Sequence, residues 1–336
     1  MSKYKNIYVF APHGFATGGV ELCHQLVDYL RNNGQSAYIV YIRDNQIALD
    51  RVVTENYRGY NIEVATVIED SAENILVLPE IFFDWMYRYD HIRLGFWWMS
   101  VDNRYYHCHW KEALKFFYQK RAYKSILSVL YHLRDRVFRN NFGDMITDEH
   151  RITHFYQSHY AQYHLYSKRI SKVMPLSDYI NTELVGCETV KKEDIILYNP
   201  AKGLSYTKRL IKKMPSYKFI PLKGLTRTEL RELFQRAKLY IDFGNFPGKD
   251  RLPREAIINS CCIVTGKKGA AGFYEDIAID ERYKFDTDKE PITKIVDCLE
   301  YVVEHYDECV EDFRFMKCRI DKEQQKFYEE INAIFI

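Results

Sequence analysis

The sequence predicts an α/β protein in which two parallel β-sheet domains follow one another along the chain. Residues 7–42 contain a short apolar segment, a glycine-rich turn, an amphipathic segment and a second apolar segment. The same order begins again at residue 195. Strands that alternate with helices form parallel sheets with right-handed crossovers, and 336 residues suffice for two domains of ordinary size.

The first domain is predicted to extend from residue 1 to about residue 190. Residues 7–12 and 37–42 are predicted strands, and the segment between them has apolar side chains at a helical period. A helical insertion is expected at about 104–165. Further strands are predicted at 63–67, 74–78, 93–98 and 171–176.

The second domain is predicted over residues 191–320. The charged segment after Pro291 has apolar residues at helical spacing, and residues 321–336 are expected to form a helix that packs back on the first domain. Two successive α/β domains place a ligand cleft between them or at the carboxyl ends of their strands. The predicted strands of this half are 195–200, 217–220, 239–243 and 261–265. Three helices are predicted between them: one that ends near residue 213, one over 227–237 and one over 253–260.

Composition excludes several classes of protein. Apolar residues make up 47% of the chain and charged residues 28%, an ordinary globular balance that excludes disorder and a collagen-like fold. The formal net charge of +2 gives no basic field for nucleic acid. The eight cysteines include no CxxC pair, so we expect reduced thiols in a cytoplasmic protein. We also expect no signal peptide and no membrane-spanning segment.

The first candidate motif is the turn Gly18-Gly19-Val20-Glu21, which follows a predicted strand and starts a predicted helix. Glycines let the backbone approach a ligand, and the free N–H groups of a helix start favour an anion. The alternative is a tight turn that needs glycine only for its geometry. On this motif alone the alternative is favoured.

The second motif follows the first strand of the second domain. Lys202 and Gly203 come directly after residues 195–200, and Lys208 lies at the start of the next predicted helix. Two lysines in these places could straddle a diphosphate. The alternative is a pair of solvated lysines in a lysine-rich chain.

The third motif carries the most information. Residues 242–256 end a buried-looking strand, pass through a loop and open a helix with a proline, a common first-turn residue. Gly248 lets backbone N–H groups meet a phosphate, and Lys249 or Arg251 adds charge. Glu255, expected in the first helical turn, offers its carboxylate to ribose hydroxyls. The alternative is a capped helix with surface charges, but the density of special residues favours a binding site.

Taken in order, these motifs resemble those of GT-B glycosyltransferases of the GT4-like kind, which include enzymes of bacterial capsule and surface-polysaccharide synthesis. The resemblance covers most of the chain. It implies two Rossmann-like domains that face a cleft, the first binding an acceptor and the second a nucleotide-sugar donor. The segments that carry the resemblance are 18–21, 202–208, 223–225, 251–256 and 264–266.

The resemblance also implies roles for individual residues. Lys202 and Lys208 are similar to the residues that hold the donor diphosphate, Lys223-Gly224 resembles the turn beside the nucleobase, and Glu255 resembles the glutamate that binds the ribose. The family often has a second glutamate eight residues earlier, where this chain has Pro247. The donor-binding residues expected on these grounds are Gly18, Gly19, Lys202, Lys208, Lys223, Gly224, Gly248, Lys249, Arg251 and Glu255.

His13 and Asp102 are the candidate catalytic residues. Each follows a predicted strand of the first domain, where a general base or an acceptor contact can reach a cleft. The alternative is a residue packed in a turn. No metal is expected, because Asp286-Thr287-Asp288 lies too late in the chain for the metal motif it resembles, and His107-Cys108-His109 has no second cluster of ligands.

Residues 104–140 form a basic and aromatic segment. They contain nine Lys or Arg, two acidic residues and nine aromatic residues. This composition suits an anionic membrane surface. The alternatives are an amphipathic insertion whose apolar side faces the core and, less favoured, a surface for nucleic acid.

The sequence thus predicts an enzyme that moves a sugar from a nucleotide-diphosphate sugar, UDP- or GDP-linked, to a lipid-linked or polysaccharide acceptor. We expect no cofactor and no metal, because lysine or arginine can stabilise the leaving diphosphate. We expect a cytoplasmic protein, peripheral on the inner face of the cytoplasmic membrane, with no nucleic-acid partner. Two alternatives stay open: a sugar-nucleotide epimerase of the same fold, and a non-catalytic scaffold in a glycan-assembly complex, which the proline at 247 favours.

Overall fold

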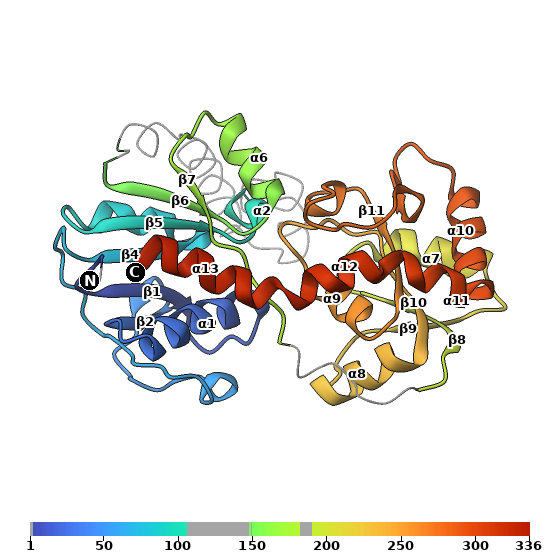
Figure 1. The fold of residues 1–336 in the computed structure, drawn as a ribbon, viewed down its shortest axis with the longest axis horizontal. Coiled ribbons are helices and arrows are strands. Elements are labelled where there is room, and N and C mark those ends of the chain that lie inside the picture. The colour runs from blue at the N-terminus through green and yellow to red at the C-terminus, as the bar shows by residue number, and fades with distance from the viewer. Residues whose placement is uncertain (1–2, 106–147, 149, 182–189) are drawn as a thin grey trace, which may run out of the picture. The chain divides into compact units, whose positions relative to one another are not determined.

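The structure is a computed structural model that describes residues 3–105, 148, 150–181 and 190–336. The chain falls into two compact units (Figure 1). Unit 1 contains Met1–Gln157, Ala161–Ser177 and Tyr328–Ile336, and unit 2 contains Ser158–Tyr160 and Asp178–Phe327. The chain therefore returns to unit 1 for its last residues.

Unit 1 is built on a seven-stranded sheet with the strand order β3-β2-β1-β4-β5-β6-β7 (Figure 1). All neighbouring strands are parallel except β2 and β3. Strand β1 lies between β2 and β4 and is almost completely buried, which explains its apolar sequence. The strands are β1 (Ile7–Pro12), β2 (Ala37–Arg43), β3 (Gln46–Ile47), β4 (Ile75–Pro79), β5 (Arg93–Trp98), β6 (Ile152–Tyr156) and β7 (Val173–Pro175).

Two segments of unit 1 differ from the sequence prediction. Residues 152–156, predicted to lie inside a helical insertion, form β6 and pair with both β5 and β7, where their apolar side chains are buried. Residues 63–67, predicted as a strand, form only a single bridge between Val64 and Ile39. Val67 is 75% exposed, so this segment has too little buried surface to extend the pairing.

Helix α1 (Gly18–Asn32) follows β1 and packs its apolar face on β1 and β2. Leu22, Leu26 and Leu30 recur at a spacing of one helical turn and are at most 2% exposed. The helix ends before Gly34, which adopts the left-handed conformation. Among the described residues, the other helices that lie wholly or partly in unit 1 are η1 (Glu55–Tyr57), η2 (Glu80–Arg88), α2 (Val101–Tyr105), α6 (His159–Ser167) and α13 (Glu323–Phe335).

The core of unit 1 is rich in aromatic rings. Phe83 stacks on Phe96 with 4.3 Å between ring centroids, and Trp98 meets Phe83 edge-on at 4.9 Å. Trp98 Nε1 also donates a hydrogen bond to His154 Nδ1 at 3.0 Å. Trp97 and Trp98 are fully buried, so both serve packing.

The last residues of the chain complete unit 1. Tyr328 stacks on Tyr29 of α1 with 4.1 Å between ring centroids. Phe335 packs against Tyr4 and Phe155, with centroid distances of 6.3 and 5.8 Å. Figure 1 shows both chain ends beside the sheet of this unit. The core of unit 1 therefore joins the two ends of the sequence.

Unit 2 is built on a five-stranded sheet with the order β12-β11-β10-β8-β9, and all four pairs are parallel. The parallel sheets of the two units confirm the predicted α/β class. The strands are β8 (Glu193–Tyr198), β9 (Lys218–Pro221), β10 (Ala237–Asp242), β11 (Cys262–Gly266) and β12 (Lys284–Phe285). In the described part of unit 2 the helices are α7 (Leu204–Lys213), α8 (Arg227–Arg236), α9 (Arg251–Ile258), η5 (Ala270–Gly272), η6 (Glu281–Tyr283), α10 (Ile292–Glu304), α11 (Tyr306–Cys309), η7 (Val310–Phe313) and α12 (Arg314–Asp321).

Lys192 ties together the ends of α8 and α9. Its ammonium donates to the carbonyl oxygens of Phe234, Ala237 and Asn259 at distances of 2.9–3.1 Å. Burial lowers the pKa of this lysine. The three hydrogen bonds satisfy carbonyl groups that a helix end leaves without an internal partner.

Replacing Lys192 with methionine is expected to lower the free energy of unfolding by about 2 kcal/mol, because these carbonyl groups lose their donor. Urea unfolding measures the change. Lys191→Met, at the exposed neighbouring position, is the control and should change stability by less than about 0.5 kcal/mol. Equal effects of the two variants would contradict this role of Lys192.

Candidate functional site

The candidate site of unit 2 lies at the carboxyl ends of β8 and β10, which are neighbours in the sheet. The loop after β8 contains Lys202 and Gly203, and the loop after β10 contains Gly244. Gly203 has a φ of +64°, and a Cβ on it would lie 2.6 Å from the Gly244 nitrogen. A Cβ on Gly244 would lie 2.5 Å from Lys202 Cγ. The two loops are in direct contact, and glycine is required where they meet.

The Lys202 ammonium lies between two carboxylates. Its Nζ is 3.3 Å from Asp242 Oδ2 and forms an ion pair with Asp250. It also donates to the Asn245 carbonyl oxygen at 3.2 Å and lies 3.7 Å from the centroid of the Phe246 ring. The side chain is 22% exposed, so the surrounding loops fix the position of its charge. An anionic ligand that bound Lys202 would compete with Asp250.

Asp242 is absent from the predicted site residues but is central to this site. It ends β10, and its carboxylate accepts hydrogen bonds from the Tyr240 hydroxyl at 3.0 Å and from the Gly244 N–H at 2.9 Å. Burial raises the pKa of Asp242, and the nearby Lys202 opposes this shift. An aspartate at the end of an apolar strand is the sequence signal that could have identified it.

Helix α9 begins earlier than predicted. It starts at Arg251, with Asp250 as its N-cap residue, rather than at Pro253. Glu255, which is predicted to lie in the first helical turn, therefore lies in the second. The proline still falls in the first turn, where its missing N–H removes no helical hydrogen bond. Glu255 is 5% exposed, and Arg251 Nε lies 3.5 Å from its Oε1, so this buried carboxylate faces a guanidinium.

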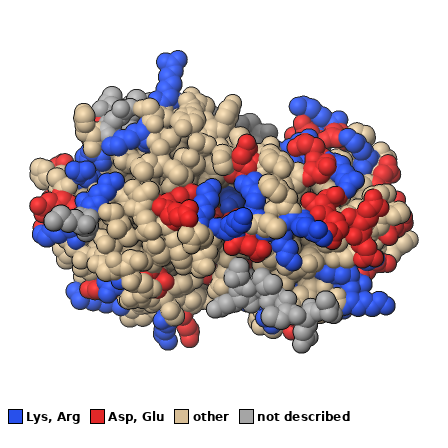
Figure 2. All heavy atoms as spheres, in the orientation of Figure 1, with Lys and Arg blue, Asp and Glu red and all other residues tan. Residues whose placement is uncertain are grey.

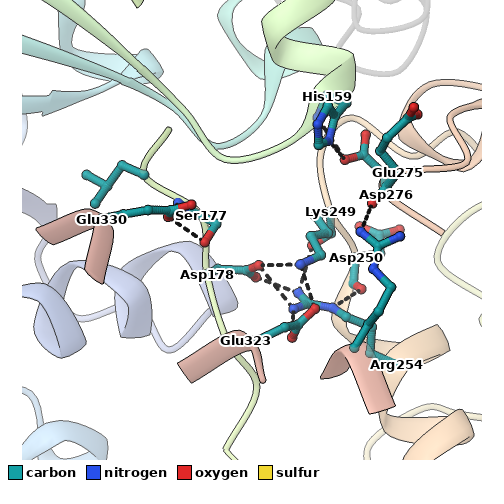
Figure 3. A network of polar contacts seen from close by, with 12 residues as sticks. His159, Ser177, Asp178, Lys249, Asp250, Arg254, Glu275, Asp276, Glu323 and Glu330 are labelled. Carbon is teal, nitrogen blue, oxygen red and sulfur yellow. Dashed lines mark hydrogen bonds and ion pairs between the residues drawn. The ribbon is translucent and has the colours of Figure 1, made fainter. Parts of the chain in front are cut away.

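Lys249 belongs to a cluster of four charged side chains in unit 2 (Figure 3). Its Nζ lies 2.5 Å from Glu323 Oε1 and 3.5 Å from Asp178 Oδ1. Arg254, which is 1% exposed, pairs with the same two carboxylates. The charge of this predicted donor-binding lysine is thus balanced within the protein. Asp178 and Glu323 lie far from Lys249 in the sequence, and no spacing indicates them.

The remaining predicted donor-binding residues of unit 2 lie on loops and on one helix. Gly248 is buried in the loop between β10 and α9. Lys208 is exposed on α7, and Lys223 and Gly224 are exposed after β9. Within the described part of the chain neither of these lysines forms an ion pair, so both ammonium groups can meet an anionic ligand.

In unit 1 the predicted glycine turn opens α1. Gly18 and Gly19 are the first two residues of the helix, and Thr17, at the N-cap, makes no capping hydrogen bond with its side chain. Glu21 is buried and accepts a hydrogen bond from the Tyr60 hydroxyl at 3.1 Å. The N–H groups of the first turn therefore receive no cap from Thr17, an arrangement compatible with an anion.

The two predicted catalytic residues have different surroundings. His13 follows β1, and its Nε2 lies 3.2 Å from Asp50 Oδ1. Arg43 Nη2 lies 2.7 Å from His13 Nδ1 and 3.0 Å from Asp50 Oδ2. Asp102 lies in the first turn of α2 and acts electrostatically on His164, whose pKa is lowered to about 4 mainly by burial.

Glu80 is a buried carboxylate of unit 1 outside the predicted site. It follows β4 as the first residue of η2, and its Oε2 accepts a hydrogen bond from the Met99 N–H at 3.3 Å. Glu80 is 4% exposed. Burial raises the pKa of this carboxyl group to about 7. The folded protein therefore holds this proton more tightly than the unfolded chain does.

Because of Glu80, the free energy of unfolding should fall as the pH rises from the unfolded-state pKa of about 4.3 towards 7. Glu80→Gln should remove about 2 kcal/mol of this decrease, since glutamine does not titrate. Urea unfolding of both proteins at pH 5 and pH 8 measures the difference. Glu73→Gln, at an exposed position, is the control. A pH dependence that Glu80→Gln leaves unchanged would show that this carboxyl group does not titrate near pH 7.

Two of the predicted features, the His-Cys-His segment and most of the basic segment, fall outside the residues that the structure describes. His107, Cys108, His109 and residues 106–140 of the basic segment lie outside the described residues. Within 3–105, 148, 150–181 and 190–336, no three metal-ligating side chains come together, and no helix is long and apolar enough to cross a membrane. Figure 2 shows basic and acidic side chains interspersed over the face that it draws, as the small net charge leads one to expect.

Solved structures share the architecture of this chain. HepE of Anabaena, in its complex with UDP and glucose, matches with a TM-score of 0.62 and 10% identity over 98% of this chain and 99% of HepE. The sucrose-phosphate synthase of Thermosynechococcus elongatus matches with a TM-score of 0.55 and 9% identity over 98% of this chain and 95% of that protein. These proteins are GT-B glycosyltransferases. The chain has the GT-B fold.

Units 1 and 2 are the two Rossmann-like domains of the GT-B fold, which confirms the predicted fold class. TarM of S. aureus, another GT-B protein, matches with a TM-score of 0.55 and 14% identity over 79% of this chain. The match spans 55% of TarM, so this chain covers about half the length of that relative. The sequence matches no protein-family model and no curated protein sequence.

Proposed function

We propose that the protein is a glycosyltransferase that moves a sugar from a nucleotide-diphosphate sugar to a lipid-linked or growing surface polysaccharide. The observation that carries the proposal is the pair of contacting loops after β8 and β10, which holds Lys202 at the strand ends of a GT-B fold. Nucleotides bind at the carboxyl ends of parallel strands in such sheets. HepE, which is similar in fold, has been crystallised with UDP-glucose and with UDP and glucose.

Unit 2 would bind the donor. Lys202 and Lys208 would neutralise the diphosphate, Glu255 would accept hydrogen bonds from the ribose hydroxyls, and the turn at Lys223 and Gly224 would lie beside the base. Catalysis would then consist of positioning the sugar and stabilising the negative charge of the leaving diphosphate. A lysine can supply that stabilisation without a metal ion, so we propose a metal-independent reaction.

Unit 1 would bind the acceptor. His13, which follows β1 and lies beside Asp50, is the candidate general base. The helix start at Gly18 and Gly19 and the carboxylate of Asp102 are candidate acceptor contacts. We further propose a peripheral location on the inner face of the cytoplasmic membrane, where the basic segment 104–140 would meet anionic lipids.

A thermal-shift screen against UDP, GDP, CDP, dTDP and inorganic phosphate, in the presence of EDTA, tests the donor site. A nucleotide at 100 times its Kd should stabilise the protein by about 2.7 kcal/mol. A shift with one nucleotide supports the donor site and identifies the base, and its loss in Glu255→Ala assigns binding to unit 2. If no nucleoside diphosphate raises the Tm at millimolar concentration, the proposal fails.

A non-catalytic GT-B scaffold in a glycan-assembly complex is the second candidate. It is favoured by Pro247, which stands where the resemblance leads one to expect a glutamate, and by the ion pair that occupies the Lys202 charge. Both candidates can bind a nucleotide, so turnover separates them. Consumption of radiolabelled UDP-glucose or GDP-mannose with a membrane extract supports the enzyme, whereas binding without consumption supports the scaffold.

A further inference from the structure

Arg254 is the centre of the charged cluster in Figure 3. A guanidinium has five N–H donors. Here Nη1 donates to Asp178 Oδ1 at 3.0 Å and to Glu323 Oε2 at 2.7 Å, and Nη2 donates to Asp178 Oδ2 at 2.5 Å. The other two donors reach the carbonyl oxygens of Lys249, at 3.2 Å from Nη2, and Asp250, at 3.1 Å from Nε. Every donor of this buried side chain has an acceptor.

The two carbonyl contacts fix the backbone just before α9. Lys249 and Asp250 are the last residues of the loop that contains Gly248, and Asp250 is the N-cap residue of the helix. Lys249 also contributes its own ammonium to Glu323 and Asp178. One buried guanidinium thus holds the end of the loop and the start of α9 in a single geometry.

The cluster is electrically balanced, with two cations and two carboxylates. Asp178 and Glu323 are 5% and 7% exposed, so water screens their charges poorly. Burial by itself would raise the pKa of Asp178, but Arg254 and Lys249 lower it, which keeps the carboxylate ionised. Asp178 therefore acts on Arg254 as a full charge.

Neither carboxylate lies on the loops or the helix that carry the proposed donor site. Asp178 precedes β8 and is separated from Arg254 by 76 positions, and Glu323 opens α13 and is separated by 69. Their contacts with the donor loop run through Arg254 and Lys249. An effect on a bound nucleotide can therefore be exerted through the backbone that these two side chains hold.

We propose that Asp178 and Glu323 are positioning residues for the donor diphosphate: by orienting Arg254, they fix the loop end at 248–250 and the start of α9. The inference rests on the proposed function, which places the donor diphosphate on unit 2, and on the sequence motif, in which Gly248 and Arg251 of this segment are predicted to meet the phosphates. It predicts a selective effect. The diphosphate should bind less tightly when the cluster is disturbed, whereas the nucleoside, whose proposed contact with α9 is Glu255 in the second helical turn, should be affected much less.

The test compares UDP with uridine, or GDP with guanosine if the thermal-shift screen selects GDP, by isothermal titration calorimetry. Asp178→Asn and Glu323→Gln should raise the Kd of the diphosphate about tenfold and that of the nucleoside much less. Glu193→Gln is the matched control, because it removes the carboxylate of an exposed Arg236 pair in the same unit. This variant should bind both ligands as the wild type does.

Two variants that keep the charge balance guard against unfolding. Asp178→Glu lengthens the carboxylate side chain, and Arg254→Lys keeps the positive charge but lacks the fork that reaches both carbonyls. Each should fold, as judged by its circular dichroism, and should raise the diphosphate Kd severalfold. Diphosphate binding like that of the wild type in these folded variants, or an equal loss for diphosphate and nucleoside, would overturn the inference. A wild-type protein that binds no nucleotide would instead refute the proposed function.

Discussion

Lys202→Met is expected to weaken the binding of a nucleoside diphosphate about a hundredfold, whereas Asp250→Asn is expected to strengthen it about tenfold. The Lys202 ammonium is the largely buried cation between the ends of β8 and β10, and its charge-assisted hydrogen bonds to a phosphate would contribute about 1.5–3 kcal/mol. Asp250 occupies the same ammonium and carries the same sign of charge as the ligand. Removing that charge should favour the diphosphate, and α9 should persist because the Asp250 side chain makes no capping hydrogen bond.

Calorimetric titration with UDP, or with whichever diphosphate the screen selects, measures both changes. Lys212→Met, which removes an exposed lysine of α7, and Asp288→Asn, which removes an exposed carboxylate paired with Lys268, are the matched controls. Weaker binding by Asp250→Asn would show that this carboxylate helps to form the site instead of competing for it. Unchanged binding by Lys202→Met would remove the lysine from the diphosphate site.

Gly203→Ala is expected to lower the free energy of unfolding by about 3 kcal/mol and to abolish nucleotide binding. A left-handed backbone costs alanine about 1 kcal/mol relative to glycine. The added methyl group would also lie 2.6 Å from the backbone of the β10 loop, so one of the two loops must move, at a cost of about 1–3 kcal/mol. Because Lys202 precedes this glycine, the movement would displace its ammonium as well.

Gly224→Ala separates the cost of the left-handed backbone from the cost of moving a loop. Gly224 has a similar φ of +68°, but a Cβ there would meet no atom within 4 Å. This variant should lose only about 1 kcal/mol, the cost of the backbone conformation. Urea unfolding compares the two. Equal losses would mean that the loops after β8 and β10 can separate freely, which would contradict the direct contact between them.

The parallel sheets could be predicted because their strands leave a strong local signal. The predicted strands at 7–12 and 37–42 are β1 and β2, and they pair in register from Ile7 with Ala37 to Pro12 with Ile42. A strand buried by parallel neighbours is apolar along its whole length. Strand β6 lacks that signal, because it contains the buried His154. The Nδ1 atom of His154 accepts a hydrogen bond from the Trp98 indole, a contact between distant residues that no local pattern reveals.

In the candidate site, too, some residues have a local signal in the sequence and others are brought together only by the fold. The motif that contains Lys202 and Gly203 could be predicted because it directly follows an apolar strand, whereas the contact of Gly203 with the loop after β10 is known only from the structure. The pairing of Asp250 with Lys202 could not be predicted, because these two residues are 48 positions apart and meet only through the turn before α9. Glu255 is also predicted to lie in the first turn of its helix, whereas it lies in the second. The proline suggests the first helical position, but the helix begins at Arg251.

The return of residues 328–336 to unit 1 has a consequence for the order in which the protein folds during synthesis. All of unit 2 leaves the ribosome before Tyr328 and Phe335 are available to cover Tyr29, Tyr4 and Phe155. Unit 2 can therefore become compact while these aromatic side chains of unit 1 are still uncovered. A chain that lacks residues 328–336 would therefore leave Tyr29, Tyr4 and Phe155 of unit 1 uncovered while it keeps every residue of unit 2.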